Sequence, residues 1–238
     1  MNNTISFTKL IEKVIKTDIK FVDGALESAK KKIQKVSNPS DNFVQKILET
    51  ELNKFKGAQF DEIKFVLDKN EKSVDEKQRL VHIARASGSI NGIVTIYYSS
   101  GLYEVFNKNF KYWKLFKNII AEFLSHELVH VIQFDKVIDK LKNNPQGYIK
   151  FIDSLGQGEQ QDHIKYLSQK LEVMAFARQS VQEFKSHGFS NEEIVKYIKN
   201  FSKADIDDSY VFYVYVYFFS KNSKVLKKFL KNVYDYAK

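Results

Sequence analysis

The segment His126-Glu127-Leu128-Val129-His130 constrains this chain more than any other part of its 238 residues. It has the pattern H-E-x-x-H and lies in a helix-forming run from about 109 to 134. Residues four apart lie on one face of a helix, so both imidazoles can bind one metal ion. Glu127 projects from the neighbouring edge of that face, where it can take a proton from a water on the metal. The segment therefore predicts a zinc-binding helix that carries a general base.

Coincidence is the competing explanation of this pattern. The chain has only 5 His, so a chance match has a probability on the order of one per cent. A surface helix with two His and one Glu as ordinary solvated residues is a second alternative. The flanking residues argue against it because they are apolar and predict a largely buried helix; they are Phe123, Leu124, Leu128, Val131 and Ile132. Buried Glu and His side chains need a partner, which favours the metal.

A catalytic zinc ion usually has three protein ligands and one water. The extension H-E-x-x-H-x-x-G-x-x-H is absent, because Gln133 stands in the position of the Gly and Lys136 in that of the third His. Glu172 is the better candidate for the third ligand, because it lies downstream on a separate predicted helix that Ser168 can cap. Ala175 lies one turn further on the same face, and its small side chain allows the two helices to approach closely.

Three residues upstream compete with Glu172 for the third ligand position. His163 is the most serious, because imidazole binds zinc well and His163 lies only nine residues before Glu172. Glu159 and Asp162 are the other two. An exposed His near a loop is the alternative for His163, and it needs no metal.

Together, the H-E-x-x-H segment and the downstream Glu172-Val173-Met174-Ala175 resemble the gluzincin type of zincin zinc metallopeptidase. The resemblance covers about residues 88–178, and the Tyr-Leu-Ser sequence before Glu172 is similar to that of small zincin-like proteins of bacteria and phages. It implies Glu127 as the general base and three zinc ligands, which are His126, His130 and Glu172. The usual thermolysin-like neighbours after Glu172 are absent, so the subfamily and substrate stay open.

The implied reaction is hydrolysis of a peptide bond by a water molecule that zinc activates and Glu127 deprotonates. One further donor is expected to stabilise the oxyanion together with the metal. The candidates for this donor are Tyr210, Tyr213, Tyr215, Tyr217, His163 and His187. The apolar, Tyr-rich run 210–219 is more often part of a core; it favours a helix, which Asp207 or Asp208 can cap.

The order of the predicted elements indicates an α+β fold. Helices are expected at 7–16, 25–36 and 41–56, strands at 63–67, 80–85 and 89–98, and only helices or loops after about 137. We therefore expect a zincin-like fold with a small mixed or antiparallel sheet packed on the metal-binding helix. A mainly helical C-terminal lobe would follow. Residues 1–238 would form a single domain, with 1–136 holding the sheet and the metal helix and 137–238 the third ligand.

The last predicted strand is a candidate for substrate binding. An extended peptide can add to an exposed sheet edge through main-chain hydrogen bonds. The strand at 90–98 directly precedes the metal helix, so it is the candidate edge. An ordinary interior strand is the alternative.

Composition bounds the remaining possibilities. The chain has no Cys, which excludes disulfides and thiolate metal sites. The N-terminal sequence does not resemble a signal peptide, and the longest apolar run, 210–219, is too short to span a bilayer. A cytoplasmic protein is expected, with association with a virion as a further possibility. The net charge of +9 fits a solubilising surface or an attraction to acidic partners, and no nucleic-acid fold signature is visible.

Two classes of function follow. The first is an active zinc metallopeptidase that acts on a peptide or protein substrate. The second is a catalytically weak structural or interaction protein with a zincin fold, such as a phage virion or host-directed component. An intact Glu127 favours the first, because a purely structural zinc site needs no base.

Overall fold

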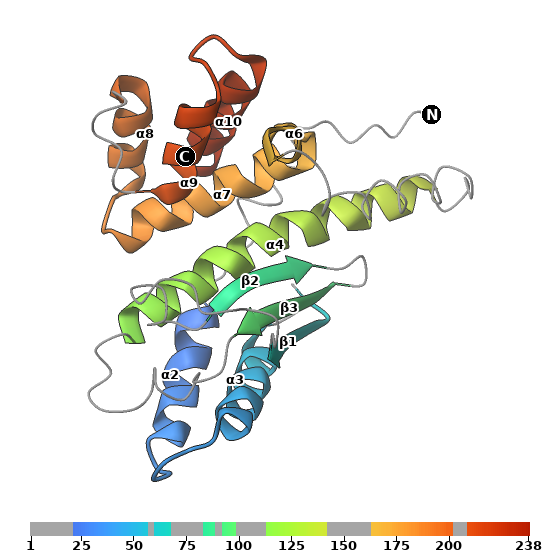
Figure 1. Cartoon of the computed structure of the whole chain (residues 1–238), viewed down its shortest axis with the longest axis vertical. Coiled ribbons are helices and arrows are strands. Elements are labelled where there is room, and N and C mark those ends of the chain that lie inside the picture. Colours follow the sequence, from blue (N-terminus) through green and yellow to red (C-terminus); the bar gives the residue numbers. More distant parts are fainter. Residues whose placement is uncertain are drawn as a thin grey trace. The chain divides into compact units, whose positions relative to one another are not determined.

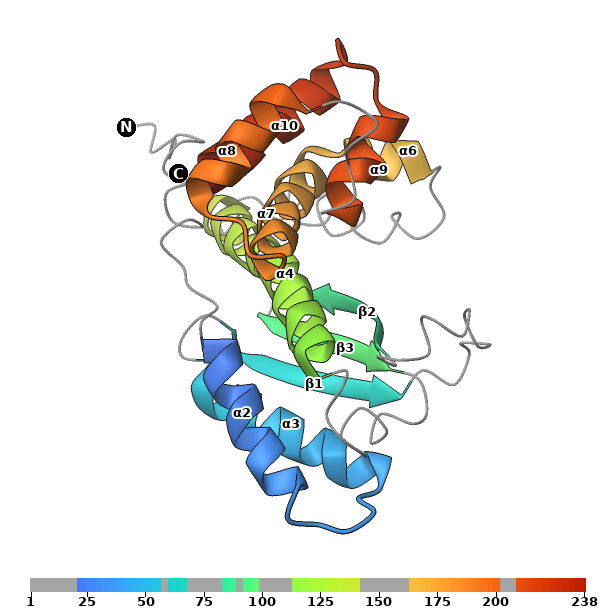
Figure 2. The same cartoon turned by 90° about the vertical axis from the view of Figure 1, so that its left-hand side faces the viewer.

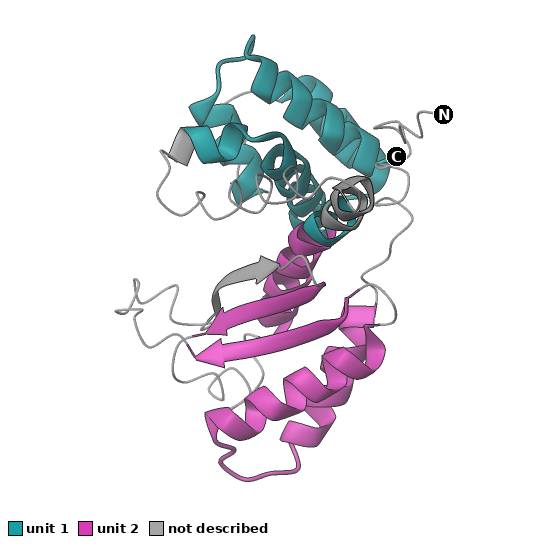
Figure 3. Cartoon of the chain, turned by 90° about the vertical axis from the view of Figure 1, so that its right-hand side faces the viewer, with its two compact units in different colours: residues 1–16, 129–238 teal, residues 17–128 magenta. Residues whose placement is uncertain are grey.

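The structure is a computed structural model, which describes residues 21–56, 60–67, 83–88, 92–98, 113–141, 163–201 and 209–238. The chain divides into two compact units (Figure 3). The sheet unit comprises Thr17–Leu128, and the helical unit comprises Met1–Lys16 and Val129–Lys238. The division falls inside one continuous helix, α4 (Trp113–Leu141). Each unit therefore contains part of α4.

The sheet unit contains a three-stranded mixed sheet. Its elements are α2 (Phe21–Ile33), α3 (Asp41–Phe55), β1 (Glu62–Leu67), β2 (Ile83–Gly88), β3 (Ile93–Tyr98) and the first half of α4. The strand order is β1-β3-β2, with β1 parallel and β2 antiparallel to β3. Within this unit, α2 and α3 cover one face of the sheet and α4 lies on the other (Figures 1 and 2).

The first half of α4 is anchored by apolar burial and by one polar cluster. Its fully buried residues recur every four positions, so they form one stripe along the helix; they are Phe116, Ile120, Leu124 and Leu128. At its start, Trp113 Nε1 donates a hydrogen bond of 2.9 Å to Glu27 Oε1 on α2. Lys117 Nζ lies 3.1 Å from the same carboxylate. These contacts fix the start of the helix that carries the H-E-x-x-H segment.

Side chains of α3 close the outer edge of β1. Asn53 donates from Nδ2 to the carbonyl of Ile63 (2.7 Å) and accepts from its N–H at Oδ1 (2.9 Å). One turn earlier, Glu49 Oε1 accepts from the N–H of Phe65 (2.7 Å). Gln45 Nε2 donates to the carbonyl of Phe65 (2.9 Å). Backbone groups that an edge strand usually leaves open are therefore paired.

The prediction that the strand at 90–98 forms an exposed edge is wrong. Residues 93–98 form β3, which is the central strand and pairs with β1 on one side and β2 on the other. Gly92 precedes it at φ +68°, and a Cβ there would lie 2.9 Å from Asp61 Oδ2. The carbonyl of Gly92 accepts a 3.0 Å hydrogen bond from the N–H of Asp61, which joins the starts of β1 and β3. No peptide can add to β3, so the hypothesis that an extended substrate pairs with this strand is wrong.

The helical unit contains five helices after α4 in the part of the chain that the structure describes. They are α6 (His163–Ser168), α7 (Lys170–Ser186), α8 (Asn191–Asn200), α9 (Tyr210–Phe218) and α10 (Lys224–Tyr236). Helix α7 packs against α9 and α10. The Tyr-rich run is helical as predicted, but Ser209 caps it by accepting from Phe212 N, and not Asp207 or Asp208.

A buried carboxylate joins α7 to the start of α9. Glu183 Oε2 accepts from the hydroxyl of Ser209 at 2.5 Å and from the N–H of Val211 at 3.1 Å. Gln179 Nε2 donates to the other oxygen at 3.2 Å. Burial raises the pKa of Glu183, although these three donors each act to lower it.

The mixed α+β class is therefore confirmed, and the alternative of a wholly antiparallel sheet is wrong. The zincin-like character of the fold and its organisation as a single domain stay predictions. The helix expected at 7–16 lies outside the described residues. No described helix has both the length and the apolarity needed to cross a membrane.

The hydrogen bonds from α3 to the outer edge of β1 should contribute to the stability of the fold. Asn53→Ala removes two hydrogen bonds to Ile63, so we expect the free energy of unfolding to fall by about 2 kcal/mol. Thr50→Ala is the matched control on the same helix, because the Thr50 hydroxyl bonds only within α3. Urea denaturation of both variants measures the difference. Equal midpoints would show that Asn53 contributes nothing to this edge.

The raised pKa of Glu183 should make the stability of the protein depend on pH. Because its pKa is raised in the folded state, the folded chain keeps a proton above pH 4.5 that the unfolded chain has lost. This contribution to stability is complete below pH 4.5 and declines as the pH rises through the folded pKa. Glu183→Gln should therefore gain in stability relative to the parent protein as the pH rises.

Glu193→Gln is the control of opposite sign in urea denaturations that extend from about pH 2.5 to pH 8, because its window lies below pH 4.5. Hydrogen bonds from the Ser190 backbone and hydroxyl lower the pKa of Glu193, so its contribution is present above pH 4.5 and is lost as the pH falls. A constant difference between Glu183→Gln and the parent protein across the range would contradict the assignment to Glu183.

Candidate metal centre

His126 and His130 lie on consecutive turns of α4, as the four-residue spacing predicts. Their exposed fractions are 7% and 8%, and that of Glu127 between them is 6%. Burial follows from the neighbouring Leu124, Leu128 and Val129, which are fully buried. The polar H-E-x-x-H residues therefore lie in an apolar setting, where ionisable groups need partners.

Glu172 lies in the first turn of α7. The preceding residues break the chain into two helices: α6 ends at Ser168, and Gln169 is the N-cap of α7 with extended backbone angles. The prediction that Ser168 caps this helix is wrong, because its hydroxyl donates back to the carbonyl of Lys165 at 2.8 Å. The first turn of a helix favours a negative charge, so α7 presents the Glu172 carboxylate at a position that suits it.

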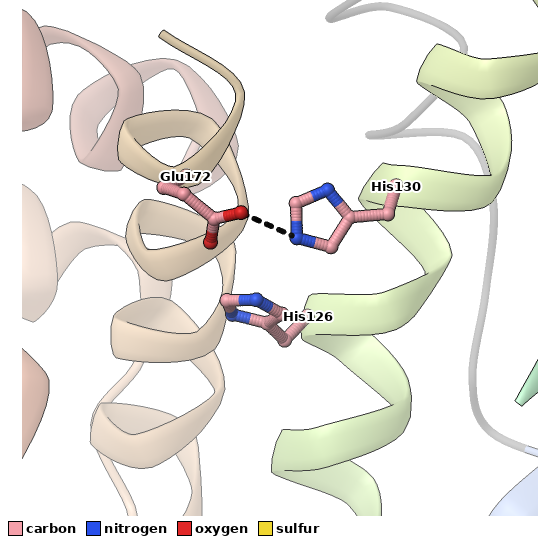
Figure 4. Close-up of side chains that lie close together, drawn as sticks. All are labelled: His126, His130 and Glu172. Carbon is pink, nitrogen blue, oxygen red and sulfur yellow. Dashed lines mark ion pairs between the residues drawn. The ribbon is translucent and has the colours of Figure 1, made fainter. Parts of the chain in front are cut away.

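The structure brings His126, His130 and Glu172 together (Figure 4). Each offers one ligand atom, and these atoms all lie within 4.8 Å of one another. His130 Nε2 lies 3.5 Å from Glu172 Oε1, a contact within the helical unit. His126 extends from the preceding turn of α4 toward the same point (Figure 4). Glu127 is not part of this group of ligand atoms.

The donor set and its spacing fit a zinc ion. Two ligands at about 2.1 Å from zinc, with a tetrahedral angle between them, are about 3.4 Å apart. The His130–Glu172 distance of 3.5 Å matches this separation. A direct charge-assisted N–H···O bond between them would be about 2.7–2.9 Å. Two imidazoles and one carboxylate also form a ligand set found at catalytic zinc sites.

Gln133 is a residue of this site that sequence reasoning missed. It is buried, and its Oε1 lies 3.2 Å from His130 Nδ1. The sequence showed only that a Gln stands where a related motif has Gly. The three-residue spacing from His130 was the available signal, because residues three apart share one helix face.

The competing third ligands are not tested. Glu159 and Asp162 lie outside the described residues, and His163 begins α6 without a described side chain.

The tyrosines proposed as oxyanion donors divide into two groups. Tyr215 is buried, and its hydroxyl donates to the carbonyl of Leu167 at 2.8 Å. Burial raises the pKa of Tyr215, and the negative charge of Glu172 raises it further. The other tyrosines are exposed on α9; they are Tyr210, Tyr213 and Tyr217. Tyr215 therefore packs beside the group as a structural residue, with its hydroxyl already bonded.

His187 is too far along α7 to act at this group. It is the C-cap of the helix, 15 residues after Glu172. A rise of 1.5 Å per residue separates the two backbones by roughly 22 Å. His187 therefore cannot stabilise an oxyanion at this group.

Comparisons with protein-family models, with curated proteins and with solved structures found no significant match to this chain.

The geometry predicts about one zinc ion per chain, bound by His126, His130 and Glu172. Substitution of any of the three by Ala should weaken zinc binding by more than the roughly 10- to 100-fold that loss of an outer-shell partner costs. Competition with a chromophoric chelator measures the affinity.

His187→Ala is the control, because His187 is a His of the same unit outside the group. Unchanged affinity in Glu172→Ala would contradict the assignment of the third ligand. If His163→Ala also loses zinc while Glu172→Ala keeps it, His163 is the third ligand instead of Glu172.

Proposed function

We propose that this chain is a zinc-dependent metallopeptidase with a zincin-like fold, which hydrolyses peptide bonds with Glu127 as the general base. The observation that supports the proposal is the grouping of the buried His126 and His130 with the half-buried Glu172, with Glu127 adjacent to the first ligand. Three donors of this type, with a carboxylate beside them, form the set that metal-assisted hydrolysis requires.

The number of donors favours a catalytic site over a structural one. Structural zinc sites are closed by four protein ligands, often including Cys, whereas catalytic sites have three and keep one position open. Within the described residues the group has three donors, and the chain has no Cys. This composition supports a site with room for water and substrate.

Metal binding and proton transfer would be carried out by different residues of the chain. When bound, zinc lowers the pKa of a coordinated water and polarises the scissile carbonyl. Glu127 accepts the proton of the attacking water and then delivers it to the leaving amine, so the carboxylate is regenerated at the end of the cycle. The two His and Glu172 hold the metal, and the apolar residues around them exclude bulk water, which strengthens these interactions.

The substrate class is a peptide or protein, and its sequence is left open. Because β3 is central and α3 closes the outer edge of β1, β2 is the other edge strand among the residues that the structure describes. An extended peptide that pairs with this sheet would therefore add to β2.

The proposal predicts that zinc binding and hydrolysis separate in two variants. Glu127→Gln keeps the shape of the side chain but removes the base, so zinc affinity should stay within about threefold of the parent protein while peptide hydrolysis falls at least about 100-fold. His130→Ala should lose both. Cleavage of a peptide library by the zinc-loaded protein, followed by mass spectrometry, measures hydrolysis.

The outcomes discriminate between the two classes of function. A parent protein that binds zinc but cleaves no peptide in the library supports the structural or interaction protein. Equal cleavage by the parent protein and by Glu127→Gln would exclude Glu127 as the base, although the metal assignment would survive.

A further inference from the structure

Gln133 contacts both helices that carry the metal ligands of the helical unit. It lies three residues after His130 on α4, and its exposed fraction is 2%. Its Oε1 lies 3.2 Å from His130 Nδ1. Its Nε2 lies 3.5 Å from the carbonyl of Leu171 and 3.5 Å from Met174 Sδ, both on α7. The same amide therefore touches a ligand and the backbone next to another ligand, Glu172.

The surroundings of the amide determine its orientation. The carbonyl of Leu171 and the thioether of Met174 are acceptors, so the amide nitrogen of Gln133 belongs on their side. Its oxygen then faces His130. An amide oxygen only accepts hydrogen bonds, so a hydrogen bond at this position requires the imidazole hydrogen on Nδ1.

This orientation has a consequence for the other imidazole nitrogen. A neutral imidazole carries its single hydrogen on one nitrogen, so a hydrogen on Nδ1 leaves a lone pair on Nε2. Nε2 is the atom that lies 3.5 Å from Glu172 Oε1. Two electron-rich atoms then face each other across a gap of the size that a zinc ion spans between two ligands.

We propose that Gln133 is a positioning residue of the metal site: its amide oxygen holds His130 with the hydrogen on Nδ1 and Nε2 directed to the metal. The inference rests on the proposed function, because it assigns an outer-shell role at the same site. Outer-shell acceptors of this kind fix the ring orientation and increase the basicity of the ligand.

The role makes opposite predictions for two substitutions of similar shape. Gln133→Leu removes the acceptor, so we expect zinc affinity to fall about 10- to 100-fold. Gln133→Glu keeps an acceptor oxygen, so zinc affinity should stay within about threefold of the parent protein or increase. A purely structural role would appear in folding instead, because a buried carboxylate destabilises the zinc-free protein more than a buried Leu does.

The test uses the full chain, loaded and stripped of zinc, at one pH. Affinity is measured by chelator competition, folding by circular dichroism, and ligand geometry by the visible spectrum of the Co²⁺-substituted protein. Gln45→Leu is the control, because Gln45 donates its amide to the β1 backbone in the sheet unit and lies outside the metal group. If Gln133→Leu does not fold, Gln133→Met replaces it.

Weaker zinc binding in the Leu or Met variant, with affinity retained in Gln133→Glu and in the control, supports the inference. Wild-type affinity and an unchanged Co²⁺ spectrum in the Leu or Met variant overturn it, while the proposed function stands. Equal losses in Gln133→Leu and Gln133→Glu also overturn it, because they indicate packing and not the acceptor. A parent protein that binds no zinc overturns the inference and the proposed function together, so the two failures are distinguishable.

Discussion

The buried imidazole of His130 and the half-buried carboxylate of Glu172 face each other, with Nε2 and Oε1 3.5 Å apart, and the proposed metal site depends on this pair. The distance is too long for a short charge-assisted hydrogen bond and close to the separation of two ligands around zinc. His126, one turn earlier on α4, adds a third donor to the same point. A bound cation is the simplest way to stabilise three electron-rich donors at one place in an apolar setting.

Helix α7 is held in place by contacts that are independent of the metal. Tyr215 stacks on Phe229 with ring centroids 4.0 Å apart, and its hydroxyl bonds to Leu167 at the break before α7. About 20 Å from the start of the helix, Glu183 bonds to the start of α9. Both ends of α7 are therefore fixed by α9 and its partners. A ligand on such a helix is pre-organised, so less entropy is lost when the metal binds.

Features that one short segment determines could be predicted from the sequence. Features that depend on contacts between distant segments could not. The His pair and the helices around it follow from periodicity, which one segment determines by itself. The central position of β3 depends on which strands pair, and β-branched residues favour edge and interior strands alike. Ser168 and Gln169 both stand at the break before α7, and Gln169, which makes no side-chain capping hydrogen bond, occupies the N-cap position instead of Ser168. The contact of Gln133 depends on a side-chain orientation that only the packing of α7 determines.

The position of Glu127 bears on the choice between an enzyme and a structural protein. Burial of a carboxylate that is 6% exposed costs free energy unless a partner compensates for the lost hydration. In a closed structural site, a neutral side chain would serve better at that position, because it avoids the cost of desolvation. Within the described residues, Glu127 is not among the three donors of the ligand group. The proposed role of Glu127 as a base beside a bound cation is consistent with both observations, because such a cation would stabilise the charge of the buried carboxylate.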